Sequence, residues 1–183
     1  INDLAEKYKL LVIEDAAHAL ETKYKGKKIG NMKNITSFSF YANKNITTGE
    51  GGMVVTNDDE LAKQFQMMRL QGISRDAWKR YGRSGYTHWE QQTVGHKCNM
   101  SDINASIGIH QLKKIDSFLK IRHKYVAMYD SAFVDVPEIE TLACHDKIDH
   151  AHHLYIIALR LEQLTVDRDG FLDAMQESGI GVA

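Results

Sequence analysis

Residues 35–56 read ITSFSFYANKNITTGEGGMVVT, and the interpretation of the chain starts from this stretch. Apolar and polar residues alternate from Ile35 to Phe40, which predicts a strand. A second strand is predicted at Gly51–Thr56. The segment between them contains one lysine, Lys44, and a glycine-rich turn. The stretch therefore predicts two strands joined by a loop that carries a single amine.

A short apolar run upstream predicts another strand of the same sheet. Leu10–Ile13 follows a predicted helix at Asp3–Lys9 and is followed by Glu14 and Asp15. Short apolar runs after helices are typical of parallel strands in α/β folds, so we expect this strand to be parallel and fully buried. Asp15 would then lie at the carboxyl end of a strand, where open α/β sheets bind their ligands.

The rest of the chain predicts further helices and strands. We expect a hairpin or loop at 24–30 and a helix from residue 59 that Asn or Asp caps. A helical stretch at 101–133 should start at Ser101 and break near Lys114–Asp116. A strand at 153–159 and a helix at 167–178, closed by Gly179, should follow. We therefore expect part of a large α/β domain at residues 1–114 and the start of a small α+β domain at 115–183. The absence of an initial Met and of a final capping signal suggests a chain truncated at both ends.

Composition excludes several classes of function. The chain has 183 residues, a net charge of -1 and a pI near 6.8, which argues against binding nucleic acid by bulk charge. No apolar run approaches the roughly 18 residues of a membrane span. The two cysteines, Cys98 and Cys144, form no disulfide framework, so we expect a reducing, cytoplasmic setting.

The residue types around Lys44 suggest a specific chemistry. A lysine placed among small and hydroxyl residues after a strand would be partly desolvated, which lowers the pKa of its amine and suits Schiff-base formation. The hydroxyls of Ser39, Thr47 and Thr48 are candidates for binding a phosphate. Asp15 could keep a pyridine nitrogen protonated, as pyridoxal phosphate chemistry requires. The alternative for a lone lysine is an exposed side chain in a hairpin loop.

Two other clusters invite different interpretations. Four histidines gather near the end of the chain, but their spacing fits no zinc pattern, so no metal site is predicted from His145, His150, His152 and His153.

The irregular stretch Gly72–Gly95 mixes basic and aromatic residues, which could contact nucleic acid. A contact with the diphosphate of a nucleotide is the better interpretation, because arginine binds phosphate in a bidentate manner. The residues concerned are Arg75, Lys79, Arg80 and Arg83, with Trp78 and Tyr81.

Three motifs together resemble one family. In chain order they are Glu14-Asp15-Ala16-Ala17-His18-Ala19, then Ser37-Phe38-Ser39-Phe40 with Lys44-Asn45-Ile46-Thr47-Thr48-Gly49-Glu50-Gly51-Gly52, and Gly95-His96-Lys97-Cys98-Asn99-Met100-Ser101-Asp102-Ile103-Asn104-Ala105. Their order and spacing resemble the DegT/StrS family of nucleotide-sugar aminotransferases, which depend on pyridoxal 5'-phosphate. The resemblance runs through essentially the whole chain and is greatest to enzymes that aminate C4 of a UDP-linked 4-keto sugar. It implies fold type I, with a mostly parallel sheet flanked by helices and a small α+β domain.

The resemblance implies a role for each motif residue. Lys44 would bind the cofactor covalently and, once released, move the proton during transamination. Asp15 would pair with the pyridinium nitrogen, and His18 would lie beside the ring and its phenolic oxygen. Ser39 would hold the cofactor phosphate. Relatives that dehydrate sugars carry histidine in place of Lys44, so the lysine favours amino transfer.

The resemblance also implies a shared active site. In the family, the Gly95–Asn99 segment comes from the neighbouring subunit of a homodimer, with Lys97 and Asn99 as the expected cofactor contacts. Many relatives have Asn at the position of Lys97 and Arg at that of Asn99, and His96 replaces a residue that is usually aromatic. The substrates implied are a nucleotide-linked keto sugar and an amino donor, usually glutamate. The alternative is a non-catalytic relative or an inactive fragment.

Overall fold

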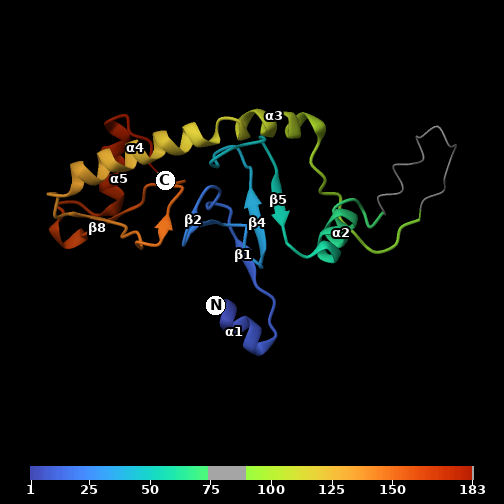
Figure 1. Ribbon diagram of the computed structural model, residues 1–183. Coiled ribbons are helices and arrows are strands. Elements are labelled where there is room, and N and C mark those ends of the chain that lie inside the picture. The colour runs from blue at the N-terminus through green and yellow to red at the C-terminus, as the bar shows by residue number, and fades with distance from the viewer. Residues whose placement is uncertain (74–89, 183) are drawn as a thin grey trace.

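The computed structural model of the chain describes residues 1–73 and 90–182 (Figure 1). The residues predicted to contact a diphosphate, from Arg75 to Arg83, lie outside the described part. The elements are, in chain order, α1 (Asn2–Tyr8), β1 (Ile13–Asp15), β2 (Lys23–Tyr24), β3 (Lys27–Lys28), β4 (Ile35–Ser39), β5 (Gly52–Val55), α2 (Asp59–Met68), α3 (Asp102–Leu112), α4 (Ile115–Phe133), β6 (Ile139–Thr141), β7 (Ile148–Asp149), β8 (Ile157–Leu159), η2 (Leu161–Gln163) and α5 (Arg168–Glu177).

Strands β1, β4 and β5 form a three-stranded sheet in the order β1-β4-β5. β1 runs parallel to β4, with Asp15 opposite Ser37. β5 runs antiparallel to β4, with Gly52 opposite Ser39. This sheet is therefore mixed, whereas a mostly parallel one was expected, because the loop at residues 40–51 returns the chain to the next strand without a crossover helix. The carboxyl ends of β1 and β4 meet at one edge of the sheet.

Polar side chains reinforce the pairing of β1 with β4. The Glu14 carboxylate accepts a hydrogen bond from Asn34 Nδ2 at 2.7 Å and another from Thr36 Oγ1 at 3.0 Å. Thr36 is completely buried. A buried hydroxyl is stable only when it is hydrogen-bonded, so these contacts also satisfy the interior of the sheet.

The first strand differs from its prediction. It comprises Ile13–Asp15 instead of Leu10–Ile13, because α1 ends with Lys9 in the left-handed conformation and the residues that follow form a connection. It is not fully buried either, since Leu11 is 81% and Ile13 is 70% exposed. No element in the described part of the chain covers these side chains.

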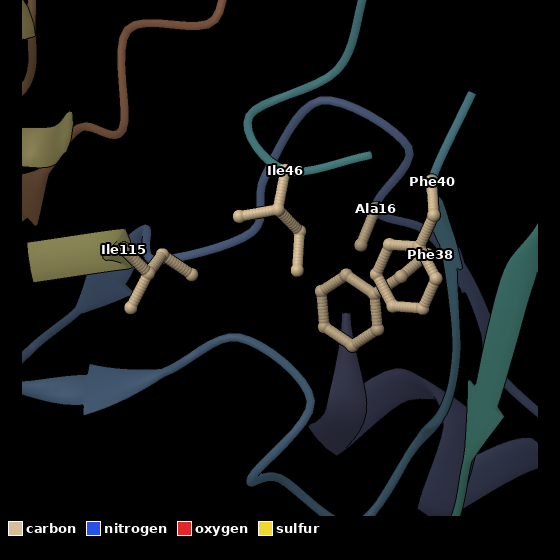
Figure 2. Packing of buried hydrophobic residues seen from close by; sticks show 5 residues of the cluster. All are labelled: Ala16, Phe38, Phe40, Ile46 and Ile115. Atoms are coloured by element: carbon tan, nitrogen blue, oxygen red, sulfur yellow. The ribbon is translucent and has the colours of Figure 1, made fainter. Parts of the chain in front are cut away.

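A small apolar cluster joins the sheet to the lysine loop and to a helix. Its members are Ala16, Phe38, Phe40, Ile46 and Ile115 (Figure 2). Phe38 and Phe40 belong to β4 and its end, Ala16 follows β1, Ile46 comes from the loop, and Ile115 begins α4. Burial of Ile46 therefore anchors the loop that contains Lys44 near the ends of β1 and β4.

The helices begin and break where the sequence predicts. Asp58 Oδ1 accepts hydrogen bonds from the backbone N–H groups of Glu60 and Leu61 and caps α2. Ser101 Oγ caps α3 by accepting from Asn104 N at 3.2 Å. α3 ends at Leu112 and α4 begins at Ile115, which confirms the predicted break. Among the described residues, no helix is long and apolar enough to cross a membrane.

The last third of the chain returns to the hairpin formed by β2 and β3. β7 pairs antiparallel with β2, and Lys23 Nζ lies 3.1 Å from the Asp149 carboxylate. This pairing crosses the expected domain boundary at residue 114, and the boundary itself remains a prediction. The strand predicted at residues 153–159 is shorter, Ile157–Leu159, because only these residues pair with β6.

Two glycines allow the packing around Phe38 to be tested. Gly30 and Gly26 both have a left-handed backbone, with φ values of 86° and 76°. A Cβ at Gly30 would lie 2.9 Å from the Phe38 ring, whereas a Cβ at Gly26 would meet nothing within 4 Å. We expect Gly30→Ala to lower the free energy of unfolding by about 2–4 kcal/mol, and Gly26→Ala by about 1–2 kcal/mol from backbone strain alone. Chemical denaturation of the full-length protein measures both, and equal losses would contradict the role of Phe38.

Candidate active site

The structure brings Lys44 and His18 into direct contact. Lys44 Nζ lies 2.6 Å from His18 Nε2, although the two residues are 26 positions apart. Lys44 comes from the loop between β4 and β5, and His18 from the turn after β1. A lysine ammonium has only donors, so a charged Lys44 makes His18 Nε2 the acceptor of this contact. The sequence could not show this pairing, because it depends on where two separate loops lie.

Asp15 and Ser39 end the two parallel strands beside this pair. Asp15 Oδ1 accepts a hydrogen bond from Ala17 N at 2.9 Å, which orients the carboxylate at the start of the turn. Ser39 Oγ accepts one from Tyr41 N at 3.3 Å. Because β1 and β4 are neighbours and parallel, both side chains lie at the same edge of the sheet. Four of the predicted site residues thus belong to one region of the fold.

The hydroxyls of Thr47 and Thr48 form hydrogen bonds within their own loop. Thr47 Oγ1 donates to Phe40 O at 3.2 Å and accepts from Gly49 N at 2.9 Å. Thr48 Oγ1 donates to Glu50 O at 2.8 Å and is almost completely buried. Both hydroxyls stabilise the backbone of their own loop, and their assignment as phosphate ligands remains a prediction. A short loop has backbone groups that no strand pairs, and nearby hydroxyls satisfy them.

Asn45, next to Lys44, holds the loop from inside. It is only 4% exposed. Its Nδ2 donates to Leu20 O at 3.2 Å and to Ala151 O at 3.4 Å, and its own backbone carbonyl accepts from Arg122 Nη2 at 2.9 Å. The loop is therefore joined to the turn after β1, to the segment after β7 and to α4. Sequence analysis identified neither Asn45 nor Arg122 as a site residue, since no periodicity or motif joins them.

His153 extends the site from the far end of the chain. Its ring centroid lies 4.3 Å from that of His18. Burial lowers the pKa of His153, and its neighbours His18, Lys44 and Arg122 lower it further. The neutral imidazole is therefore favoured beside the lysine. The sequence predicted a strand at His153 and no metal site from the clustered histidines, and neither prediction indicates the contact with His18.

Tyr155 keeps the segment that contains His153 attached to α4. Its hydroxyl donates to Asp130 Oδ1 at 2.7 Å, and its ring stacks on Tyr129 with centroids 4.9 Å apart. Burial and the hydrogen bond to Asp130 raise the pKa of Tyr155 to about 12. The phenol therefore remains a neutral donor at any physiological pH.

Lys97 and Asn99 do not join this group. Lys97 pairs in a β-bridge with Leu70, just after α2, and the Lys97 and Asn99 side chains are exposed. Figure 1 shows the segment beyond β5, on the side away from β2. Within one chain, these two residues therefore cannot be assigned to the Lys44 region, and their role in a neighbouring subunit remains a prediction.

The clustered histidines do not form a metal site among the described residues. No group of three or more His, Cys, Asp or Glu side chains is arranged there to hold an ion. His150 Nδ1 instead accepts a hydrogen bond from the backbone N–H of His152 at 2.9 Å, and His123 Nε2 lies 2.9 Å from His150 O. Rings that form such contacts organise the backbone of the segment.

The four predicted residues fit a phosphorylated pyridine aldehyde. Lys44 offers an amine that can attack a carbonyl, and His18 offers an imidazole that can accept its proton. Asp15 offers a carboxylate for a protonated ring nitrogen, and Ser39 offers a hydroxyl for a phosphate. These groups are of the right chemical types and are held on backbone that the sheet and the apolar cluster fix.

Two curated proteins match nearly the whole of this chain. It is 47% identical over 180 residues to the uncharacterized protein MJ1066 of Methanocaldococcus jannaschii, covering 98% of this chain and 47% of the relative. It is 41% identical over 174 residues to the spore coat polysaccharide biosynthesis protein SpsC of Bacillus subtilis, covering 95% of this chain and 45% of the relative. The chain thus spans about half the length of the curated relatives it matches.

Solved structures and a family profile agree with these relatives. Spr1654 of Streptococcus pneumoniae, a candidate sugar aminotransferase with structures of a PLP form and a PMP form, superposes with a TM-score of 0.81 at 33% identity, over 97% of this chain and 44% of that one. The profile of the DegT/DnrJ/EryC1/StrS aminotransferase family matches residues 1–183. The parallel pair β1 and β4, with Lys44 and His18 at its edge, therefore belongs to a member of the DegT/DnrJ/EryC1/StrS aminotransferase family.

Proposed function

We propose that the protein is an aminotransferase that uses pyridoxal 5'-phosphate to transfer an amino group from glutamate to a nucleotide-linked keto sugar. The observation that carries this proposal is the 2.6 Å contact between Lys44 Nζ and His18 Nε2 at the edge where Asp15 and Ser39 end their strands. Membership of the aminotransferase family and the PLP and PMP forms of Spr1654 support it.

Each residue has a defined role in this proposal. When bound, the cofactor supplies an electron sink for the carbon that loses its proton. Lys44 binds it covalently and then moves a proton at the reacting carbon. His18 accepts the proton that Lys44 must lose before its amine can attack. Asp15 keeps the ring nitrogen protonated, and Ser39 donates to the phosphate.

The substrate class is argued from the family and from one relative. SpsC acts in the biosynthesis of spore coat polysaccharide, so a sugar substrate in cell-surface polysaccharide, lipopolysaccharide or amino-sugar biosynthesis is proposed here. Lysine rather than histidine at position 44 favours amino transfer over dehydration. Within this class, C4 of a UDP-linked 4-keto sugar is the proposed acceptor.

A homodimer completes the proposed site. The segment at residues 95–99 pairs with the turn after α2 and lies beyond β5, on the side away from β2 (Figure 1). Such a placement supports an active site shared by two subunits, in which Lys97 and Asn99 of each chain contact the cofactor bound to the other chain. The alternative, a non-catalytic relative, is an outcome of the tests below.

Lys44→Ala tests the covalent attachment. We expect the full-length protein incubated with pyridoxal phosphate to form an adduct that borohydride fixes on Lys44, because this amine alone has an imidazole acceptor within hydrogen-bond distance among the described lysines. Peptide mass mapping identifies the modified residue. The matched control is Lys63→Ala, since Lys63 is exposed on α2 and contacts only Glu60. A protein that forms no adduct, or one whose adduct survives Lys44→Ala, would favour the non-catalytic alternative.

Asp15→Asn tests the electronic role of the carboxylate. The amide has nearly the same shape but cannot stabilise a protonated ring nitrogen. We expect the adduct on Lys44 to form normally while turnover with glutamate falls by about 100-fold or more, the scale on which one catalytic group acts. Turnover is measured with a panel of UDP- and dTDP-linked keto sugars. Full turnover in Asp15→Asn would show that this carboxylate does not face the ring.

A further inference from the structure

Arg122 contacts the lysine loop from α4 without being part of the predicted site. Its Nη2 donates to the backbone carbonyl of Asn45 at 2.9 Å, across 77 positions of sequence. Asn45 directly follows Lys44, so this bond acts on the peptide beside the reactive amine. The helix that carries Arg122 is itself held in place, because Ile115 is buried in the apolar cluster and Phe118 packs against it.

The guanidinium of Arg122 is partly buried. Burial lowers the pKa of Arg122, and no described carboxylate lies within salt-bridge distance of it. Placing an arginine in such surroundings is costly unless its donors are used. The Asn45 carbonyl is the acceptor that the structure provides.

The positive charge of Arg122 also reaches the imidazole pair beside Lys44. It is one of the charges that lower the pKa of His153, after burial, His18 and Lys44. Three elements face the His153 ring with charged or titratable groups: the turn after β1 with His18, the loop after β4 with Lys44, and α4 with Arg122. Removing the charge of Arg122 should therefore raise the pKa of His153.

We propose that Arg122 is a positioning residue of the Lys44 site, which fixes the backbone after Lys44 through the Asn45 carbonyl and adds a permanent charge beside His153. Asn45 transmits the constraint, since its side chain bonds Leu20 O and Ala151 O on the two segments that carry His18 and His153. The catalytic benefit of this positioning rests on the proposed function, whereas the contacts of Arg122 and Asn45 do not depend on it.

The test compares Arg122→Met, Arg122→Lys and the control Arg168→Met in the full-length protein. Methionine keeps much of the length but removes charge and donors, whereas lysine keeps the charge but cannot copy the guanidinium geometry. Arg168 is an exposed arginine on α5 that contacts only Asp169. Two quantities are measured without cofactor: the pKa of His153 by NMR titration, assigned with His153→Asn, and the rate at which acetic anhydride labels Lys44, by mass spectrometry.

We expect distinct results for the three variants. Arg122→Met should raise the pKa of His153 and change the labelling rate of Lys44 by about 10-fold, the effect of losing one hydrogen bond to a charged group. Arg122→Lys should keep the pKa of His153 low and change the labelling rate less. Arg168→Met should match the unchanged protein in both.

The inference is overturned if a folded Arg122→Met variant, checked by thermal unfolding, matches the control in both quantities. If this variant does not fold, Arg122→Lys decides: a changed Lys44 labelling rate supports the inference, and an unchanged one overturns it. Failure of the unchanged protein to bind pyridoxal phosphate at Lys44 would refute the proposed function alone, because neither measurement here depends on the cofactor.

Discussion

The parallel pairing of β1 with β4 is the constraint on which the candidate site depends. It sets Asp15 opposite Ser37 and brings the ends of both strands to one edge. The strands are short, so the Glu14 contacts with Asn34 and Thr36 contribute to a pairing that few backbone bonds support. If this register shifted by one residue, side chains would exchange faces and Asp15 would no longer lie with Ser39. The chemistry of the site therefore begins with a strand pairing.

The lysine loop is held in place by several kinds of contact that its own residues make. Ile46 is buried with Phe38 and Phe40, Thr47 and Thr48 satisfy the backbone, and Asn45 joins two distant segments. A long, flexible lysine side chain must be confined before its amine can act at a defined place. These polar contacts are individually modest, but together they leave the loop few alternative conformations. This is also why residues far apart in sequence affect Lys44.

Much of the local structure could be predicted, and the differences have identifiable causes. Alternation located β4, and the caps Asp58 and Ser101 located α2 and α3, because these signals act within a few residues. β1 began later than its apolar run, because only Ile13–Asp15 pair with β4. Likewise, the last predicted strand is limited to Ile157–Leu159, the residues that pair with β6. Which residues meet a partner strand depends on how distant parts of the chain pack, and the residue types carry no signal of it.

The sequence by itself determined the chemical groups of the site and their order: a carboxylate after one strand, a hydroxyl at the end of another, and a single lysine in the loop that follows. These depend on residue type and short-range pattern. Only the tertiary structure decided that His18 touches Lys44, that His153 and Arg122 come close to them, and that Thr47 and Thr48 serve the backbone. Contacts between loops depend on where the elements pack, and packing is a property of the whole chain that no short pattern contains.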